Sequence, residues 1–349
     1  MPASSSDRPF ARPADCAACR QSIRHGSKSF YMASMLMPAA AREPAYAVYA
    51  FCRMADDLVD AGEGGTQAVA SIREALARIY AGRPADDFVE RAFADVVRDF
   101  AIPRAVPEAL VEGLEWDSAG RDYETLSDLV AYALRVAGTV GVMMTLVMGR
   151  RETDVLARAC DLGVAMQLTN ICRDVGEDAA MGRVYLPHAF LREAGILPAE
   201  IATMGRKSPA LETVLSELLA EAERLYDRAR PGIAALPGGS RTGIAAARLL
   251  YREIGRLVSS GLDPMTTRAI VPKGRKLALL ARAAGQRLSA DIGLDAPALD
   301  EARFLIDAVG RSRRTVKLEP LPQWWNVQAR TTRMIELLAR FERRGMAAG

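Results

Sequence analysis

Two segments of the 349-residue chain stand out, Arg53-Met-Ala-Asp56-Asp57-Leu-Val-Asp60 and Asn170-Ile-Cys-Arg173-Asp174-Val-Gly-Glu177-Asp178. Each places two aspartates four residues apart within a run of helix-forming residues. Residues four apart share one face of an α-helix and lie about 6 Å from each other. We therefore expect each segment to present a pair of carboxylates on one helix face.

Both expected helix faces carry further polar side chains in register with the aspartates: Tyr49, Arg53, Gln167 and Asn170. The other residues around them are largely apolar. A single acidic face of this kind is usually a solvated surface. Two such faces on apolar helices favour another interpretation, because carboxylates that repel one another and lose water need cations to neutralise them.

The ligand chemistry points to a hard divalent cation. Carboxylate and amide oxygens without neighbouring histidine or cysteine favour Mg²⁺ or Mn²⁺. Magnesium prefers one or two carboxylates, with water and substrate phosphate completing its shell, so a phosphate ester is the expected ligand. The chain has no G-x-x-x-x-G-K-[ST] and no strand followed by G-x-G-x-x-G, so a nucleotide-binding fold is not expected.

Composition and periodicity predict an all-α, single-domain helical bundle over residues 15–310. Helix formers dominate segments such as 211–229 and 245–258, whereas alternating β-branched runs are scarce. Proline and glycine divide the chain into about a dozen helices. The expected breaks are Pro38, Gly62–Gly65, Pro103, Gly149, Pro187, Pro198, Pro209 and Gly238-Gly239.

The most apolar segment, residues 136–149, is shorter than the roughly 20 residues that a membrane-spanning helix needs. We interpret it as a buried helix. Its small residues Gly138, Thr139 and Gly141 would allow close approach of a neighbouring helix or of an extended apolar ligand.

The two ends of the chain differ from its middle. Residues 1–14 are polar and proline-rich without an apolar core, so we expect a disordered tail and no secretory signal. Residues 311–349 form a basic helical extension around Trp324-Trp325. This extension is interpreted either as a solvated helix or as a contact with the anionic inner face of a membrane.

Cysteine content and net charge limit the cellular location and the classes of partner to be expected. Five cysteines, three of them in apolar helical surroundings, are typical of reduced thiols, which predicts a cytoplasmic protein without disulfides. The net charge of +3 is small for this length, so nucleic acid is not an expected partner.

Longer motifs surround the two aspartate segments. They are Gly26-Ser27-Lys28-Ser29-Phe30-Tyr31, Tyr49-Ala-Phe51-Cys52-Arg53, Val136-Ala-Gly138-Thr139-Val-Gly141, Gln167-Leu-Thr-Asn170, Gly182-Arg183-Val-Tyr185-Leu186-Pro187 and the run 268–277. Together they resemble the squalene/phytoene synthase family, and within it the bacterial members that form phytoene. The similarity spans roughly residues 16–290, and the second aspartate motif with its Gly-Arg-Val-Tyr-Leu-Pro sequel is its most specific part.

The resemblance implies a class I isoprenoid synthase fold, with helices enclosing a central cavity. The implied reaction is the Mg²⁺-dependent head-to-head condensation of two geranylgeranyl diphosphates to phytoene through a cyclopropyl diphosphate, without NADPH. This reaction begins carotenoid synthesis, so downstream carotenoid enzymes are candidate partners. Several Mg²⁺ or Mn²⁺ ions would be bound by Asp56, Asp60, Asn170, Asp174 and Asp178.

The resemblance also implies roles for other residues, with Tyr49 and Arg53 joining the aspartates as catalytic residues. Substrate would be bound by Ser27, Lys28, Ser29, Phe30, Tyr132, Val136, Gln167, Asn170, Arg173, Arg183, Tyr251 and Arg268. The cationic members of this set would stabilise the leaving diphosphate. The aromatic and apolar members, with Ala137, Val140 and Gly141, would shield carbocations from water.

Two alternatives remain open at the level of sequence. A squalene, dehydrosqualene or presqualene diphosphate synthase would carry the same aspartates but use farnesyl diphosphate. A non-catalytic relative would serve as an assembly or lipid-binding module. Intact aspartate pairs argue against the second alternative, because such a module has no need for metal-binding carboxylates.

Overall fold

The computed structural model describes residues 9–60 and 65–312, and every regular element within these ranges is a helix. The prediction of an all-α fold is therefore confirmed. The chain divides into one compact unit over Met1–Arg311 and a second over Ser312–Gly349. The predicted basic extension lies, from residue 313 onward, outside the described residues.

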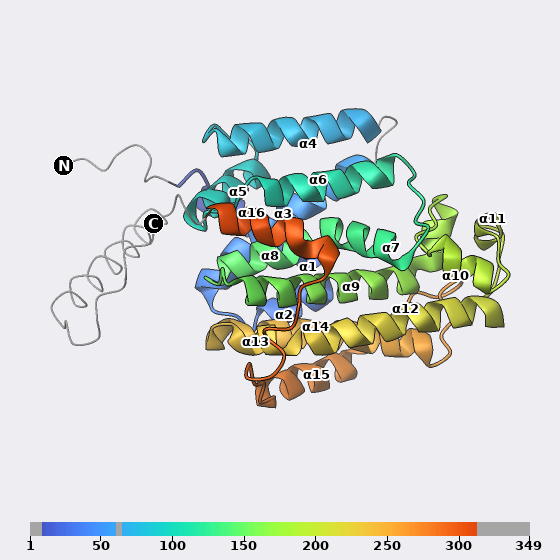
Figure 1. Cartoon of the computed structure of the whole chain (residues 1–349). Helices are drawn as coiled ribbons and strands as arrows, with labels where there is room; N and C mark the ends of the chain where they lie inside the picture. Colours follow the sequence, from blue (N-terminus) through green and yellow to red (C-terminus); the bar gives the residue numbers. More distant parts are fainter. Residues whose placement is uncertain (1–8, 61–64, 313–349) are drawn as a thin grey trace, which may run out of the picture. The chain divides into compact units, whose positions relative to one another are not determined.

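The helices follow one another along the chain, with longer connections on either side of α15 (Figure 1). They are α1 (Pro13–Gly26), α2 (Lys28–Ser34), α3 (Ala39–Asp60), α4 (Gly65–Tyr80), α5 (Phe88–Asp99), α6 (Ala105–Ser118), α7 (Leu126–Ala133), η2 (Leu134–Gly138), α8 (Thr139–Val147), α9 (Thr153–Ala180), α10 (His188–Glu193), α11 (Pro198–Ile201), α12 (Pro209–Arg228), α13 (Arg230–Ala235), α14 (Gly238–Ser259), α15 (Lys273–Gly285), η3 (Asp300–Ala302) and α16 (Arg303–Ser312).

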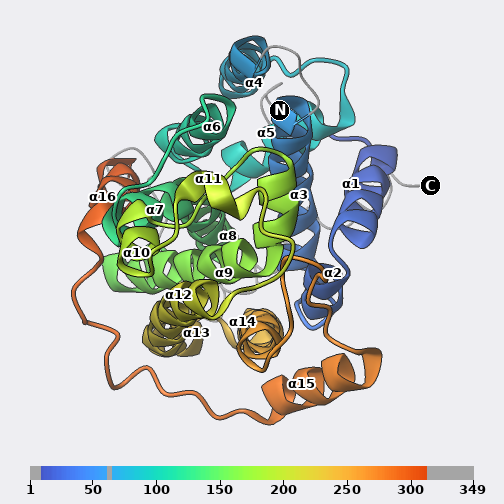
Figure 2. The same cartoon turned by 90° about the vertical axis from the view of Figure 1, so that its right-hand side faces the viewer.

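The 28-residue helix α9 lies at the centre of the first unit. It packs against η2 and α8 on one side and against α12, α13 and α14 on the other (Figures 1 and 2). Buried residues occur around much of its circumference, which is the pattern of a helix enclosed by others. A polar side chain on the buried faces of α9 therefore has to find a partner inside the protein.

Most predicted breaks coincide with helix ends. Pro198 and Pro209 occupy the first turns of α11 and α12, where a missing backbone N–H costs nothing. The predicted helical segments 211–229 and 245–258 lie within or end at α12 and α14. Gly238-Gly239 begin α14 rather than precede it, and the predicted break at Gly62–Gly65 falls mainly outside the described residues.

The apolar segment 136–149 is buried as predicted, but it is not one regular α-helix. Residues Leu134–Gly138 form a π-helical turn, η2, and α8 continues from Thr139. A Cβ at Gly141 would lie 2.7 Å from the carbonyl oxygen of Ala159, so glycine lets α8 approach α9 closely.

One helical run among the described residues, Leu126–Val147, is long and apolar enough to cross a bilayer by length and composition alone. Within the protein, 61% of its most apolar window is buried, and its elements pack against α6 and α9. The core helix of a globular protein passes the same test, and the packing assigns this run to the core.

The prediction of a disordered tail through residue 14 is wrong for residues 9–14. The backbone amides of Phe10 and Ala11 each donate a hydrogen bond of 2.9 Å to the carboxylate of Asp95 on α5, and α1 begins at Pro13. Asp15 on α1 then pairs with Arg91 at 2.8 Å. These partners are distant in sequence, so local composition does not reveal them.

Candidate active site

The two predicted carboxylate pairs come together in one acidic region. Asp56 and Asp60 lie in the last turns of α3, and Asp174 and Asp178 lie in the last turns of α9. Arg183, in the loop after α9, reaches across to α3, where its Nη1 lies 2.9 Å from Oδ1 of Asp60. This ion pair joins the two carboxylate-bearing segments.

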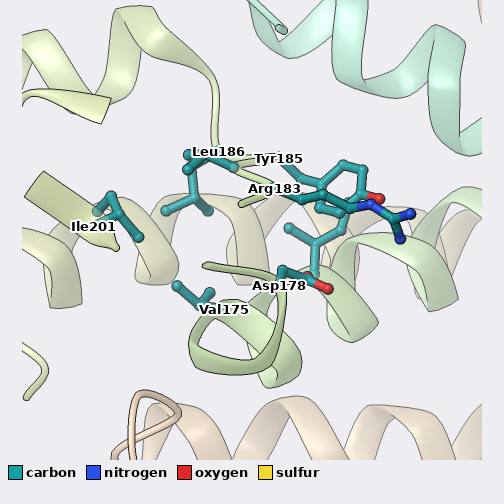
Figure 3. A pocket seen from close by; sticks show the side chains of 8 residues that line it. Val175, Asp178, Arg183, Tyr185, Leu186 and Ile201 are labelled. Atoms are coloured by element: carbon teal, nitrogen blue, oxygen red, sulfur yellow. The ribbon is translucent and has the colours of Figure 1, made fainter. Parts of the chain in front are cut away.

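Burial and mutual repulsion perturb the carboxylates of this region. Loss of solvent, followed by the negative charge of Asp60, raises the pKa of Asp56. The same two causes, burial and then the charge of Asp174, raise the pKa of Asp178 from 3.8 to about 7. Figure 3 shows the Asp178 carboxylate and the Arg183 guanidinium pointing to the same side, away from the apolar side chains of Val175 and Ile201.

A partly buried carboxylate that sequence analysis missed, Asp117 on α6, completes the acidic region. Its two oxygens accept hydrogen bonds from the hydroxyls of Tyr132 at 2.8 Å and Tyr185 at 2.9 Å. Burial raises its pKa to about 6, with Arg183 acting in the opposite direction and Asp56 in the same direction. Asp117 thus lies close enough to interact with the first aspartate pair and with the loop after α9.

Tyr132 was expected on the cavity wall, and the structure places it elsewhere. Its ring stacks on Tyr185 with centroids 5.2 Å apart and lies 5.1 Å from the ring of Tyr123. Because its hydroxyl donates to Asp117, Tyr132 belongs to the support of the acidic region. Only the tertiary contact between α6, α7 and the loop after α9 reveals this.

Cationic side chains surround the second aspartate pair. Arg173 donates hydrogen bonds to the carboxylate of its neighbour Asp174, and Nε of Arg268 lies 3.0 Å from Oδ1 of the same residue. Arg268 also pairs with Glu177 at 3.3 Å. A Cβ at Gly176 would lie 2.6 Å from the carbonyl oxygen of Met265, so glycine there lets the segment that carries Arg268 rest on α9.

The Ser27-Lys28-Ser29 motif begins α2. The hydroxyl of Ser27 caps this helix by accepting a hydrogen bond of 3.3 Å from the N–H of Phe30, and Lys28 is exposed. Lys276 on α15, which the sequence identified only as part of the run 268–277, lies near Lys28: burial and the charge of Lys28 lower its pKa. Two adjacent ammonium groups form a site suited to an anion such as diphosphate.

An elongated apolar cavity of about 320 Å³ runs along α9. The residues of α9 that line the cavity recur every three to four positions, on one face of the helix, from Val155 to Asn170. Its wall includes Phe30, Tyr49, Val136, Ala137, Val140, Gly141 and Tyr251, all of which were predicted to surround substrate. The rings of Phe30 and Tyr251 stack with centroids 5.0 Å apart, and the partly buried thiol of Cys52 lies in the same wall, where desolvation raises its pKa to about 12.

The cavity and the acidic region adjoin. Cys52 lines the cavity on α3, and Asp56 follows one helical turn later. Asn170 lines it on α9, with Asp174 one turn beyond. An elongated apolar molecule in the cavity would therefore present a charged end to both carboxylate pairs.

The donor set fits divalent cations of the magnesium type. Oδ1 of Asn170 is buried without a hydrogen-bond partner, and burial, followed by the negative charge of Asp174, raises the pKa of the Asp178 carboxylate. No three His, Cys, Asp or Glu side chains cluster tightly enough within residues 9–60 and 65–312 to bind one ion alone. Each site would thus use few protein carboxylates and take its remaining ligands from substrate phosphate and water, as Mg²⁺ prefers.

The predicted site residues thus divide into groups. The five proposed metal ligands, Arg53, Arg173, Arg183 and Arg268 lie in or beside the acidic region, and Arg53 pairs with Asp56 at 3.5 Å and Asp57 at 2.7 Å. Phe30, Tyr49, Val136, Gln167, Asn170 and Tyr251 line the cavity. Ser27, Lys28 and Ser29 belong to the α2 start and Tyr132 to the Asp117 cluster. The individual roles of these residues remain predictions.

Comparison with known proteins identifies relatives over most of the chain. The family model for squalene/phytoene synthase matches residues 23–275. A phytoene synthase of Cereibacter sphaeroides is 43% identical and covers 94% of each chain. A phytoene synthase of Rhodobacter capsulatus is 49% identical, covering 78% of this chain and 81% of its own.

Solved structures share the fold. A dehydrosqualene synthase with bound ligand superposes with a TM-score of 0.72 at 31% identity, covering 78% of this chain and 96% of its own. A squalene synthase of Alicyclobacillus acidocaldarius superposes with a TM-score of 0.65 at 26% identity, covering 71% and 94%. Both bear out the predicted isoprenoid synthase arrangement of helices.

Proposed function

Because the chain belongs to the squalene/phytoene synthase family, we propose that it is a phytoene synthase that condenses two geranylgeranyl diphosphates head to head. In this reaction the first substrate loses diphosphate, and the double bond of the second attacks the resulting allylic cation. A proton leaves, and a cyclopropyl diphosphate forms. Loss of the second diphosphate, rearrangement and loss of another proton give the C40 hydrocarbon phytoene, without an external reductant.

One observation carries the proposal: the apolar cavity along α9 ends one helical turn from both aspartate pairs. A prenyl tail fits the apolar part, and its diphosphate fits the acidic region with its surrounding cations. A binding module for uncharged lipid would need the cavity but not the four carboxylates at its end.

The chain's own cations would hold the diphosphate and stabilise it as it leaves. Arg173 and Arg268 lie beside Asp174, and Lys28 and Lys276 lie near each other at the starts of α2 and α15. The Lys276 site is held in place by its neighbour Arg275, whose Nε lies 2.9 Å from the buried carboxylate of Glu253 on α14. Charge-assisted hydrogen bonds from such groups strengthen as negative charge develops on the departing oxygen.

Magnesium would be held by Asp56, Asp60, Asn170, Asp174 and Asp178, and when bound it supplies Lewis-acid stabilisation of the leaving diphosphate. The protein's part is to fix these ligands. Arg183 bridges the loop after α9 to Asp60, and Asp117 anchors Tyr185 in the same loop. Both contacts hold the two carboxylate-bearing segments in register.

The cavity wall protects the carbocations. Most of its lining is apolar, so water has few sites from which to quench an allylic or cyclopropylcarbinyl cation. Phe30 and Tyr251 supply aromatic faces, and Met166 supplies a polarisable sulfur, both of which interact favourably with positive charge. Burial raises the pKa of the Tyr251 hydroxyl to about 12, so this group stays protonated beside the substrate.

The similarity to a dehydrosqualene synthase and a squalene synthase keeps farnesyl diphosphate as the second candidate substrate. The deciding experiment incubates the purified full-length protein with Mg²⁺ and either prenyl diphosphate, without NADPH, and identifies the extractable product by mass spectrometry. Phytoene from the C20 substrate supports the proposal. A C30 product, or turnover only after NADPH is added, would assign the squalene-type reaction instead.

We also propose a cytoplasmic enzyme that works at the inner face of the membrane beside downstream carotenoid enzymes. The support is chemical, because the prenyl tail and the hydrocarbon product both partition into lipid. Vesicle flotation of the full-length protein, with and without anionic lipid, tests this location.

A further inference from the structure

We propose that residues 286–299, called the strap below, close the far end of the cavity and thereby limit the length of the prenyl chain. This inference rests on the proposed function. It identifies the residues that limit the length of the prenyl chain, which the aspartate motifs do not determine.

The far end of the cavity is built from a small apolar cluster that is separate from the main core. Its buried members are Met37, Ala41, Met148, Val155 and Leu236, packed with Met144, Ala235, Ile244 and Leu294. We call this set the floor cluster. All its members except Ala41, Ala235 and Leu294 line the cavity directly. Leu294 comes from the strap and packs against the cluster without lining the cavity itself.

The depth of the floor matches a C20 chain. Val155 lies about 22 Å from Asn170 along α9, at about 1.5 Å per residue. An extended C20 prenyl chain, with carbon–carbon bonds of about 1.5 Å, is roughly 19 Å long, and each isoprene unit changes this by roughly 5 Å. A C25 chain would therefore strike the floor cluster, and a C15 chain would leave it unfilled.

Two arginines anchor the strap on either side of Leu294. Arg158 donates from Nη1 to the carbonyl oxygen of Gly293 at 3.1 Å and from Nη2 to that of Pro297 at 3.3 Å. Arg228 donates to the Pro297 carbonyl at 2.7 Å. The strap runs between α15 and α16 past α13 (Figure 2).

A single buried carboxylate holds both arginines. Oδ2 of Asp161 lies 2.9 Å from Nε of Arg158 and 3.2 Å from Nε of Arg228, and the side chains of Arg158 and Asp161 are 0% and 1% exposed. Oδ2 of Asp161 thus pairs with both guanidinium groups, whereas its Oδ1 is buried without a hydrogen-bond partner. Removing one member of such a buried pair leaves an uncompensated charge. The ion pairs hold the strap so that Leu294 packs against the floor cluster. This cluster is rich in methionine, whose flexible side chain would otherwise adapt to longer ligands.

The test compares substitutions that face the floor with matched ones that do not. Leu294→Ala removes the strap's contact, and Ile292→Ala, two residues away and 86% exposed, is its control. Met148→Ala, at the C-terminal cap of α8, deepens the floor, and Met143→Ala, within α8 and buried outside the cavity, is its control. Each full-length variant is assayed with Mg²⁺ and C15, C20 or C25 diphosphate, after circular dichroism has verified its helix content.

We expect the wild type to disfavour C25 against C20 in kcat/KM by at least about tenfold, and Leu294→Ala and Met148→Ala to narrow this ratio by about tenfold. Both controls should keep the wild-type ratio. If each test variant behaves like its control, the inference is overturned while phytoene synthesis from C20 still stands. If the wild type turns over none of the three substrates, the proposed function fails and this inference with it.

Discussion

The two carboxylate-bearing helices have the same spacing of aspartates but different surroundings. On α3, the side chains of Asp56, Asp60 and Arg53 are 47%, 44% and 48% exposed. On α9, the side chains of Arg173 and Asp174 are both 14% exposed. Arg173 and Asp174 on α9 are thus more enclosed than the group on α3, which borders solvent. The same spacing of aspartates therefore occurs on a more enclosed helix, α9, and on a more solvent-exposed one, α3.

Removing one carboxylate from either helix tests whether both halves are required. We expect Asp174→Ala and Asp56→Ala each to lower kcat by at least about 10³-fold, because each loses a ligand for the ions that stabilise the leaving group. Asp154→Ala, at the exposed start of α9, is the control. Steady-state assays and thermal unfolding measure the effects. Full activity in either test variant would refute the metal assignment.

Removing the ion pair that joins the loop after α9 to α3 should have the next largest effect on activity. Arg183→Gln loses the 2.9 Å ion pair to Asp60, and we expect kcat/KM to fall by roughly 10²-fold with little change in unfolding temperature. Arg192→Gln, whose guanidinium pairs with Glu124 on the surface, provides the comparison. Equal kinetics for both variants would show that the bridge has no part in the reaction.

Asp117→Asn weakens the hydrogen bonds that hold Tyr132 and Tyr185 beside the acidic region. The amide oxygen can accept from Tyr185 or Tyr132 but carries no charge, so we expect kcat to fall by roughly tenfold. The exposed Asp122→Asn should have no effect. Unchanged kcat in Asp117→Asn would show that Asp117 only packs the fold.

Asp178 should also make the stability of the metal-free protein depend on pH. The folded pKa of Asp178 is about 7, above its ordinary value of 3.8, so the folded state binds more protons than the unfolded state between these values. Its contribution to stability is therefore present at low pH and is lost as pH rises through about 7.

Thermal unfolding in EDTA measures this dependence. We expect a Tm lower by a few degrees at pH 8 than at pH 5.5, a smaller difference in Asp178→Asn, and recovery at pH 8 when Mg²⁺ is added. A slope in Asp178→Asn identical to that of the wild type would assign the dependence to other groups.

The smallest effects are expected from the acidic neighbours that lie off the two shared faces. Asp57 pairs with Arg53 and Glu177 with Arg268, and both side chains are more than half exposed. Exposed pairs contribute at most about 1 kcal/mol, so Asp57→Asn and Glu177→Gln should stay within roughly fivefold of the wild-type rate. A loss like that of Asp174→Ala would add the affected residue to the metal ligands.

Much of the fold followed from local patterns. Helix-forming composition, proline positions and the apolar run 136–149 predicted helices that the structure contains. The π-helical turn of η2 and the ordered segment 9–14 were not predicted, because both depend on neighbours elsewhere in the chain, such as α9 for η2 and Asp95 for Phe10.

The candidate site divides in the same way. The aspartate pairs and the residues around them were found because their spacing is periodic along single helices. Asp117 was missed, since it is an isolated charge in an ordinary helix and gains its meaning only from Tyr132 and Tyr185. Lys276 was recognised only as part of the run 268–277, because its nearness to Lys28 depends on the tertiary structure. A motif joining such residues has no fixed separation in sequence.

The amino-acid sequence alone therefore established the helical class, the two ligand-bearing faces and the family they resemble, because these depend on interactions between residues three or four apart. Only the tertiary structure decided which half of the site is buried, which carboxylates have raised pKa values, and where the cavity ends. Desolvation and charge coupling act through space, so they depend on which distant helices and loops pack together.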